Sequence, residues 1–170
     1  MFTSWNHDKW FAYVLHKGLT YFREEYLVST EHANWYHQDG RSTYDSYRSQ
    51  SDEAIYQHKT AFYDRLRYYH VEGNTLFVHG GFHVDQGFEE IIRTNQEQML
   101  WDRSLYRADV EHWQINNNLR LIGKSTKDRR FGRFETIYIG HTPTVLDGFT
   151  QPTKMANVIN VDQGCKCWAY

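Results

Sequence analysis

The sequence has few cysteines and no long apolar run. The only two cysteines, Cys165 and Cys167, are separated by one residue, so no internal disulfide is expected. They could form a soft-metal or redox site, although incidental thiols are the favoured interpretation. No apolar stretch reaches the roughly 18 to 20 residues of a membrane-spanning helix, and residues 1–10 lack the features of a secretory signal. We therefore expect a soluble, cytoplasmic protein in a reducing compartment.

An excess of positive charge is also missing. The formal net charge is −2 and the pI is near 6.5, which argues against nucleic acid or an acidic membrane as a partner. Hydrophobic residues make up 40% and aromatic residues 17% of the chain, a composition typical of a folded protein. At 170 residues the chain is long enough for one domain, and two are not expected.

Several common catalytic and nucleotide-binding motifs are absent. The sequence contains no G-x-x-x-x-G-K-[ST] loop, no G-x-G-x-x-G turn, no H-E-x-x-H pair and no G-x-S-x-G elbow. These absences argue against P-loop proteins, dinucleotide-binding folds, zincins and serine hydrolases.

Three short apolar runs predict buried strands. They span residues 75–78, 136–139 and 157–161, and each is followed by polar residues and glycine: His79-Gly80-Gly81, Gly140-His141 and Asp162-Gln163-Gly164. A turn at residues 72–74 leads into the first strand. In open α/β sheets, ligands bind at the strand ends and in the loops that follow them.

Helical spacing of apolar residues predicts three helices. They lie at residues 9–17, 52–70 and in the segment from Phe88 to Met99. The triplet Asn6-His7-Asp8 before the first helix is most simply a helix cap. Residues 19–51 have an irregular pattern, and residues 123–133 are expected to form a loop. Together these elements predict an α/β fold with helices covering a sheet.

Two histidines that follow strands, together with an amide, form a plausible cation site. Neutral imidazole and amide oxygen suit divalent ions such as manganese, iron or zinc. A single histidine of this kind is more often structural, so the metal interpretation depends on the combination.

Four motifs together resemble a known family. Asn6-His7-Asp8, His79-Gly80-Gly81, Trp101-Asp102-Arg103 and Gly140-His141-Thr142-Pro143-Thr144 occur in the order and approximate spacing of the calcineurin-like metallophosphoesterases. The chain is most similar to the bacterial and phage branch of the serine/threonine phosphoprotein phosphatases. Residues 35–47 and 159–165 resemble two further motifs of that branch, with Asp39 in place of a glycine. The resemblance implies a metallophosphoesterase-like β-sandwich flanked by helices.

The resemblance also implies roles for individual residues. Asn6, His79 and His141 would be metal ligands, with manganese as the favoured ion and iron or zinc as alternatives. His7 would be the general acid that protonates the leaving oxygen. Arg103 would hold the phosphate of a phosphoprotein or other phosphoester through its planar guanidinium. The family hydrolyses its substrates by direct in-line attack of a hydroxide that two metal ions activate.

The chain departs from the family at its ends. It lacks the motifs D-x-H-G and G-D-x-x-D-R-G, which supply ligands of the second ion and the bridging carboxylate, and Trp5 stands where the family has a glycine. We therefore expect residues 1–170 to be a single phosphoesterase domain that is incomplete at the N-terminus and at the C-terminus. At most one ion is expected, and activity of the chain alone should be weak or absent. The alternative is a non-catalytic remnant, or a fragment that binds phosphate or protein.

Overall fold

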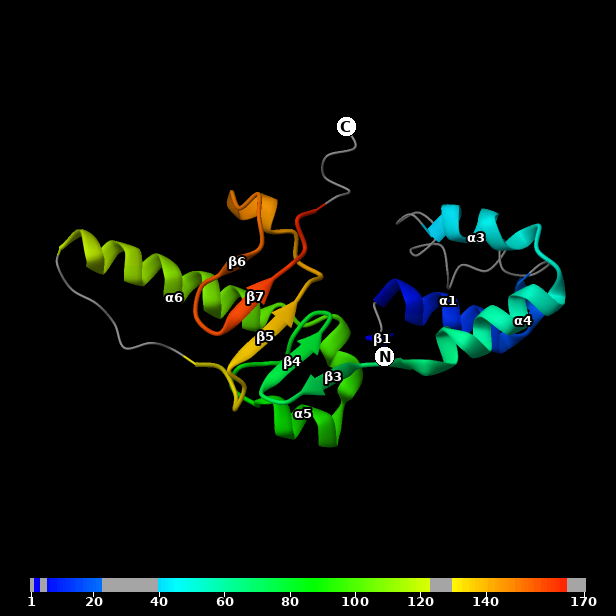
Figure 1. Cartoon of the computed structure of the whole chain (residues 1–170), viewed down its shortest axis with the longest axis horizontal. Coiled ribbons are helices and arrows are strands. Elements are labelled where there is room, and N and C mark those ends of the chain that lie inside the picture. The colour runs from blue at the N-terminus through cyan, green and yellow to red at the C-terminus, as the bar shows by residue number, and fades with distance from the viewer. Residues whose placement is uncertain (1, 4–5, 23–39, 123–129, 165–170) are drawn as a thin grey trace. The chain divides into compact units, whose positions relative to one another are not determined.

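A computed structural model describes residues 2–3, 6–22, 40–122 and 130–164 (Figure 1). The chain forms two compact units, Met1–Arg67 and Tyr68–Tyr170. Within the described residues, no helix has both the length and the apolar character that crossing a membrane requires.

The first unit is mainly helical. Its elements are α1 (Asn6–Lys17), α3 (Arg41–Arg48), α4 (Asp52–Ala61), the short 3₁₀ helix η5 (Tyr63–Arg65), and a parallel pair of two-residue strands, β1 (Phe2–Thr3) and β2 (Leu66–Arg67). The helix predicted at residues 9–17 is confirmed and begins three residues earlier. The core of the unit consists of Phe11, Val14, Leu15, Phe22, Tyr44 and Ile55.

Helix α3 lies in the segment of irregular sequence pattern, for which no helix or strand is predicted. The helix is short and rich in polar residues, and tertiary contacts stabilise it more than helix propensity does. The ring of Tyr44 packs 5.1 Å from that of Phe22, and the ring of Tyr47 packs 4.8 Å from that of Phe11.

The helix predicted at residues 52–70 is correct only in its first half. Ser51 caps α4 by accepting a hydrogen bond from the Ala54 backbone N–H, and the helix ends at Ala61. The rest of the predicted helix is η5, β2 and the start of strand β3 (Tyr69–Glu72). The β-favouring residues of β3 pair antiparallel with β4 (Thr75–Val78), so ladder hydrogen bonds replace the expected helix.

The second unit is a mixed α/β fold with a five-stranded sheet flanked by helices. The strand order is β3-β4-β5-β7-β6, where β5 is Thr136–Ile139, β6 is Thr153–Lys154 and β7 is Val158–Asn160. The three central strands, β4, β5 and β7, are parallel, and the two outer strands are antiparallel to their neighbours. The three predicted strands are confirmed, the first two with the expected bounds. The predicted turn at residues 72–74 joins β3 to β4, with Gly73 at φ 56°.

Helices α5 (Phe88–Thr94) and α6 (Ser104–Leu121) and the 3₁₀ helices η6 (Gln96–Leu100) and η7 (Thr144–Asp147) complete this unit. The helical segment predicted from Phe88 to Met99 is confirmed as α5 followed by η6. Residues 130–133 are neither helix nor strand, as the loop prediction requires, while residues 123–129 lie outside the described part of the chain.

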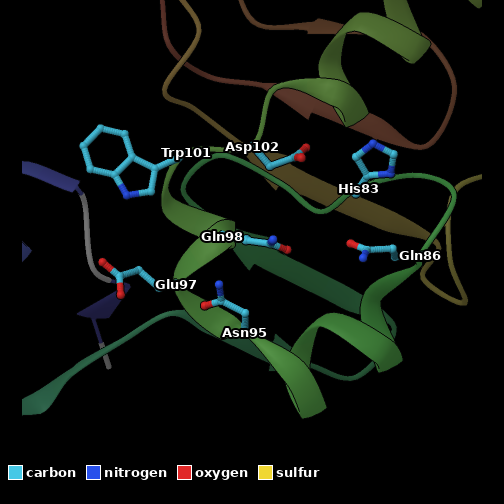
Figure 2. A pocket seen from close by; sticks show the side chains of 7 residues that line it. All are labelled: His83, Gln86, Asn95, Glu97, Gln98, Trp101 and Asp102. Atoms are coloured by element: carbon cyan, nitrogen blue, oxygen red, sulfur yellow. The ribbon is translucent and has the colours of Figure 1, made fainter.

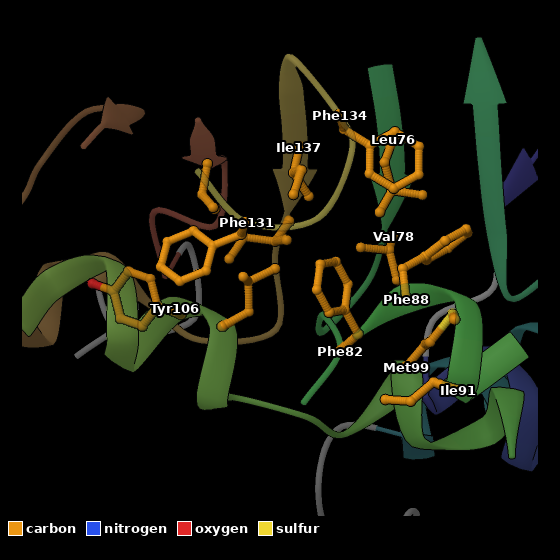
Figure 3. Close-up of a cluster of buried hydrophobic side chains, with 13 residues drawn as sticks. Leu76, Val78, Phe82, Phe88, Ile91, Met99, Tyr106, Phe131, Phe134 and Ile137 are labelled. Atoms are coloured by element: carbon orange, nitrogen blue, oxygen red, sulfur yellow. The ribbon is translucent and has the colours of Figure 1, made fainter. Parts of the chain in front are cut away.

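One face of the sheet carries the core of the second unit (Figure 3). Alternate residues of the central strands are buried, as the two-residue period of a strand requires. Leu76, Val78 and Ile137 pack with residues of α5, η6 and α6 and with two phenylalanines that precede β5. These helical and loop residues are Phe88, Ile91, Met99, Leu105, Tyr106, Phe131 and Phe134.

Candidate functional site

The candidate site lies at one edge of the five-stranded sheet. Because β4, β5 and β7 are parallel neighbours, their carboxyl ends lie at the same edge. His79 follows β4 directly, and Gly140 and His141 follow β5. The fold therefore brings together two histidines that are 62 positions apart in the sequence.

The imidazole rings of His79 and His141 contact each other. Their centroids are 4.9 Å apart and their planes are inclined by 60°. Both side chains are half-buried. The Gly140 backbone N–H donates a hydrogen bond of 2.7 Å to the His79 carbonyl, which joins the two loops directly beside the rings.

The separation of these two rings can be compared with that of two imidazoles that bind one divalent ion. Two imidazoles that bind one ion through nitrogens about 2.1 Å from it have ring centroids on the order of 5 Å apart. The observed separation of 4.9 Å is close to that value, and it also lies in the range of ordinary packing between two rings. Within residues 8–22, 40–122 and 130–164, no group of three or more His, Cys, Asp or Glu side chains is placed to hold a metal ion.

Gly80 allows the loop after β4 to approach η6 closely. Its backbone N–H donates a 2.7 Å hydrogen bond to the Met99 carbonyl. A Cβ at this position would lie 2.8 Å from the Asp102 carbonyl oxygen and 2.9 Å from that of Met99. Only glycine fits such a contact without a shift of the backbone, so Gly80 sets how the His79 loop meets residues 99–102.

The Trp101-Asp102-Arg103 motif lies between η6 and α6. The Trp101 ring packs edge-on against the His141 ring, with centroids 6.0 Å apart. The Asp102 carboxylate accepts hydrogen bonds from the backbone N–H of Ser104 (2.9 Å) and from its hydroxyl (2.8 Å), which fixes the first turn of α6. Arg103 is exposed immediately before this 18-residue helix.

Asn6 and His7 belong to the first unit. They are the first two residues of α1, and their side chains lie outside the described part of the structure. Because the helix already begins at Asn6, the triplet lies within the first turn instead of preceding the helix. The metal-ligand role of Asn6 and the acid role of His7 stay predictions of the family resemblance.

A polar cavity adjoins the same loops (Figure 2). Its volume is about 400 Å³, and it lies among residues that follow β4 and residues in and after η6. In Figure 2 the indole of Trp101 and the carboxylate of Glu97 point to one side, and the Asp102 carboxylate points toward His83. The lining residues are His83, Gln86, Asn95, Glu97, Gln98, Trp101 and Asp102. The sequence pattern did not indicate this cavity, because isolated amides on polar segments are typical of any protein surface.

Two half-buried imidazoles thus meet at the edge of the sheet, and an exposed arginine follows two residues after the tryptophan that contacts His141. Neutral imidazole is a ligand for zinc, iron and manganese. A comparison with models of known protein families finds no match for the chain, and a comparison with curated proteins finds no significant match.

Proposed function

We propose that the chain is a portion of a metallophosphoesterase-like catalytic domain that hydrolyses phosphoesters with a divalent cation. The observation that carries this proposal is the contact between His79 and His141 at the ends of neighbouring parallel strands. The five-stranded sheet of the second unit would be one layer of the family's β-sandwich. The favoured substrates are phosphoserine and phosphothreonine in proteins, with other phosphoesters as the wider class.

His79 and His141 would each give one ring nitrogen to the ion, which the resemblance predicts to be manganese, or iron or zinc. When bound, such an ion supplies Lewis-acid stabilisation of phosphoryl charge and lowers the pKa of a coordinated water. The resemblance adds Asn6 as a third ligand and His7 as the acid for the leaving oxygen.

Arg103 would hold the phosphate. Its guanidinium has the planar fork that matches phosphate oxygens. It is exposed at the start of α6. The Asp102 carboxylate already accepts the Ser104 N–H at this helix end, so the attraction for phosphate would come from the arginine itself.

Activity of this chain alone should be low. The sequence lacks the motifs that provide the second ion and the bridging carboxylate in the family it resembles, so the stabilisation from a two-ion clamp is lost. One ion held mainly by neutral ligands also binds more weakly than one held by carboxylates.

The test is turnover of a chromogenic phosphate ester by the purified chain with added Mn²⁺. We expect slow turnover that disappears in His141→Ala and persists in His83→Ala, which removes an exposed histidine outside the proposed ligand set. Turnover that survives His141→Ala would contradict the proposed site. Absence of turnover from a folded chain that binds Mn²⁺ would contradict hydrolysis and favour a non-catalytic, phosphate-binding module.

A further inference from the structure

The backbone of His141 has an unusual conformation. Its φ of 65° makes it the only residue other than glycine with a positive φ in the parts of the chain that the structure describes. A side chain in this left-handed region is strained, so surrounding contacts must hold it there. The direction in which the His141 ring points therefore depends on the residues that hold its loop.

Two hydrogen bonds fasten this loop immediately before and after His141. On the near side, the Gly140 N–H donates to the His79 carbonyl at 2.7 Å. On the far side, the Nδ2 group of Asn160 donates to the Thr142 carbonyl at 2.9 Å. His141 lies between these two hydrogen bonds. Of the two, only the second is made by a side chain, that of Asn160.

Asn160 also fixes the neighbouring loop. It is the last residue of β7 and only 2% exposed. Its Oδ1 accepts a 2.9 Å hydrogen bond from the Asp162 N–H. The Asp162 carbonyl in turn accepts hydrogen bonds from the Thr144 N–H (2.9 Å) and hydroxyl (3.1 Å). The loops after β5 and β7 are thus joined by the two Thr144 bonds to Asp162 and by the Asn160 amide, which alone reaches the residue directly after His141.

We propose that Asn160 is a positioning residue that keeps the His141 ring against the His79 ring in the geometry that binds a divalent cation. The part of this role that concerns metal binding rests on the proposed function. The position of the His141 ring is a property of the metal-free protein. Asparagine offers the donor for Thr142 and the acceptor for Asp162 on separate atoms, whereas alanine offers neither. Groups that orient a ligand in this way commonly change metal affinity without touching the metal.

The chain offers a matched control in Asn157, at the opposite end of β7. This side chain is 4% exposed and also joins buried loops, accepting from the Phe131 N–H (2.8 Å) and donating to the carbonyls of Phe131 (3.0 Å) and Phe134 (2.8 Å). Its replacement by alanine should destabilise the fold as Asn160→Ala does. It leaves the loops after β5 and β7 in place.

The experiment measures two quantities in Asn160→Ala and Asn157→Ala. The first is the proximity of the His79 and His141 rings in the metal-free protein, from NMR cross-peaks between the ring protons. The second is Mn²⁺ affinity, from electron paramagnetic resonance titration. We expect Asn160→Ala to lose the cross-peaks and to weaken Mn²⁺ binding about tenfold or more. Asn157→Ala should keep both.

Asn160→Ser is measured in parallel in case Asn160→Ala does not fold. Its hydroxyl is polar, so the buried backbone groups of Thr142 and Asp162 lose less on substitution. Cross-peaks that persist in either folded Asn160 variant would overturn the proposal, as would equal losses in Asn157→Ala. If the parent binds no Mn²⁺ but loses its cross-peaks on Asn160→Ala, the positioning role holds and the metal function fails. If the parent binds Mn²⁺ and Asn160→Ala binds it with the same affinity, the positioning role of Asn160 fails and the proposed metal function stands.

Discussion

The imidazole rings of His79 and His141 lie with their centroids 4.9 Å apart at the carboxyl edge of a parallel strand pair. The contact follows from topology, because each histidine comes after an apolar strand and the two strands are neighbours. A hydrogen bond from Gly140 to the His79 carbonyl joins the loops, and Trp101 covers one edge of the His141 ring.

Gly80→Ala should destabilise the second unit. The added Cβ would lie 2.8 Å and 2.9 Å from two backbone carbonyl oxygens, so the backbone must move. We expect the free energy of unfolding to fall by about 1 to 3 kcal/mol, as in other overpacked sites. Urea denaturation measures this change.

Gly140→Ala is the control for Gly80→Ala. The nearest atom to its added Cβ would be the His79 carbonyl oxygen, at 3.7 Å, which is ordinary contact. Its free energy of unfolding should change by no more than about 0.5 kcal/mol. Equal effects of the two substitutions would show that the contact of Gly80 with residues 99–102 is not the cause.

Tyr106→Phe should make stability less dependent on alkaline pH. Burial of the ring, together with the 2.8 Å hydrogen bond to Asp147, raises the pKa of the Tyr106 hydroxyl above its ordinary value. A raised pKa in the folded state means that the stabilisation is complete below the ordinary pKa of about 10 and is lost as pH rises above it.

The hydrogen bond should therefore stabilise the parent by about 1 kcal/mol relative to Tyr106→Phe near pH 8, and this advantage should disappear near pH 11. Urea denaturation at the two pH values gives the difference. Tyr56→Phe, which removes an exposed hydroxyl, is the control. A constant difference between parent and Tyr106→Phe would contradict the assignment.

Arg103→Ala should weaken binding of inorganic phosphate to the Mn²⁺-loaded chain about tenfold or more, because a charge-assisted pair contributes on the order of 1.5 to 3 kcal/mol. Arg103→Lys should fall between alanine and the parent, since an ammonium lacks the planar fork. Isothermal titration calorimetry measures the affinities. Arg107→Ala removes an exposed arginine one turn further along α6 and should change little. Similar losses at both positions would indicate general charge attraction only.

The sequence pattern predicted the central strands well. Continuous apolar runs at residues 75–78 and 136–139 are bounded by glycine and polar residues, so period and length both pointed to buried strands. The pattern also predicted histidines in the loops after these strands, and the two rings meet because the strands are parallel neighbours.

Other elements were hidden because their apolar pattern is ambiguous. Ile55, Phe62, Leu66 and Tyr69 fit a helical period, yet the chain leaves the helix at Ala61 to pair residues 69–72 with β4. The spacing of apolar residues along the chain does not show that residues 69–72 will pair with another strand.

Helix α6 was not evident either. Two of its four buried residues are polar, namely Asp109 and His112. The Asp109 carboxylate is satisfied by the Ala156 backbone N–H, at 3.0 Å, from a loop distant in sequence. Such a partner cannot be read from local sequence.

The central claim is that His79 and His141 hold one divalent cation, and Mn²⁺ titration followed by electron paramagnetic resonance tests it most directly. The account predicts one saturable Mn²⁺ per chain in the parent and in His83→Ala. It predicts at least about tenfold weaker binding in His79→Ala and in His141→Ala, because each loses one of the few ligands. A parent that binds no Mn²⁺, or variants that bind it as tightly as the parent, would contradict the account.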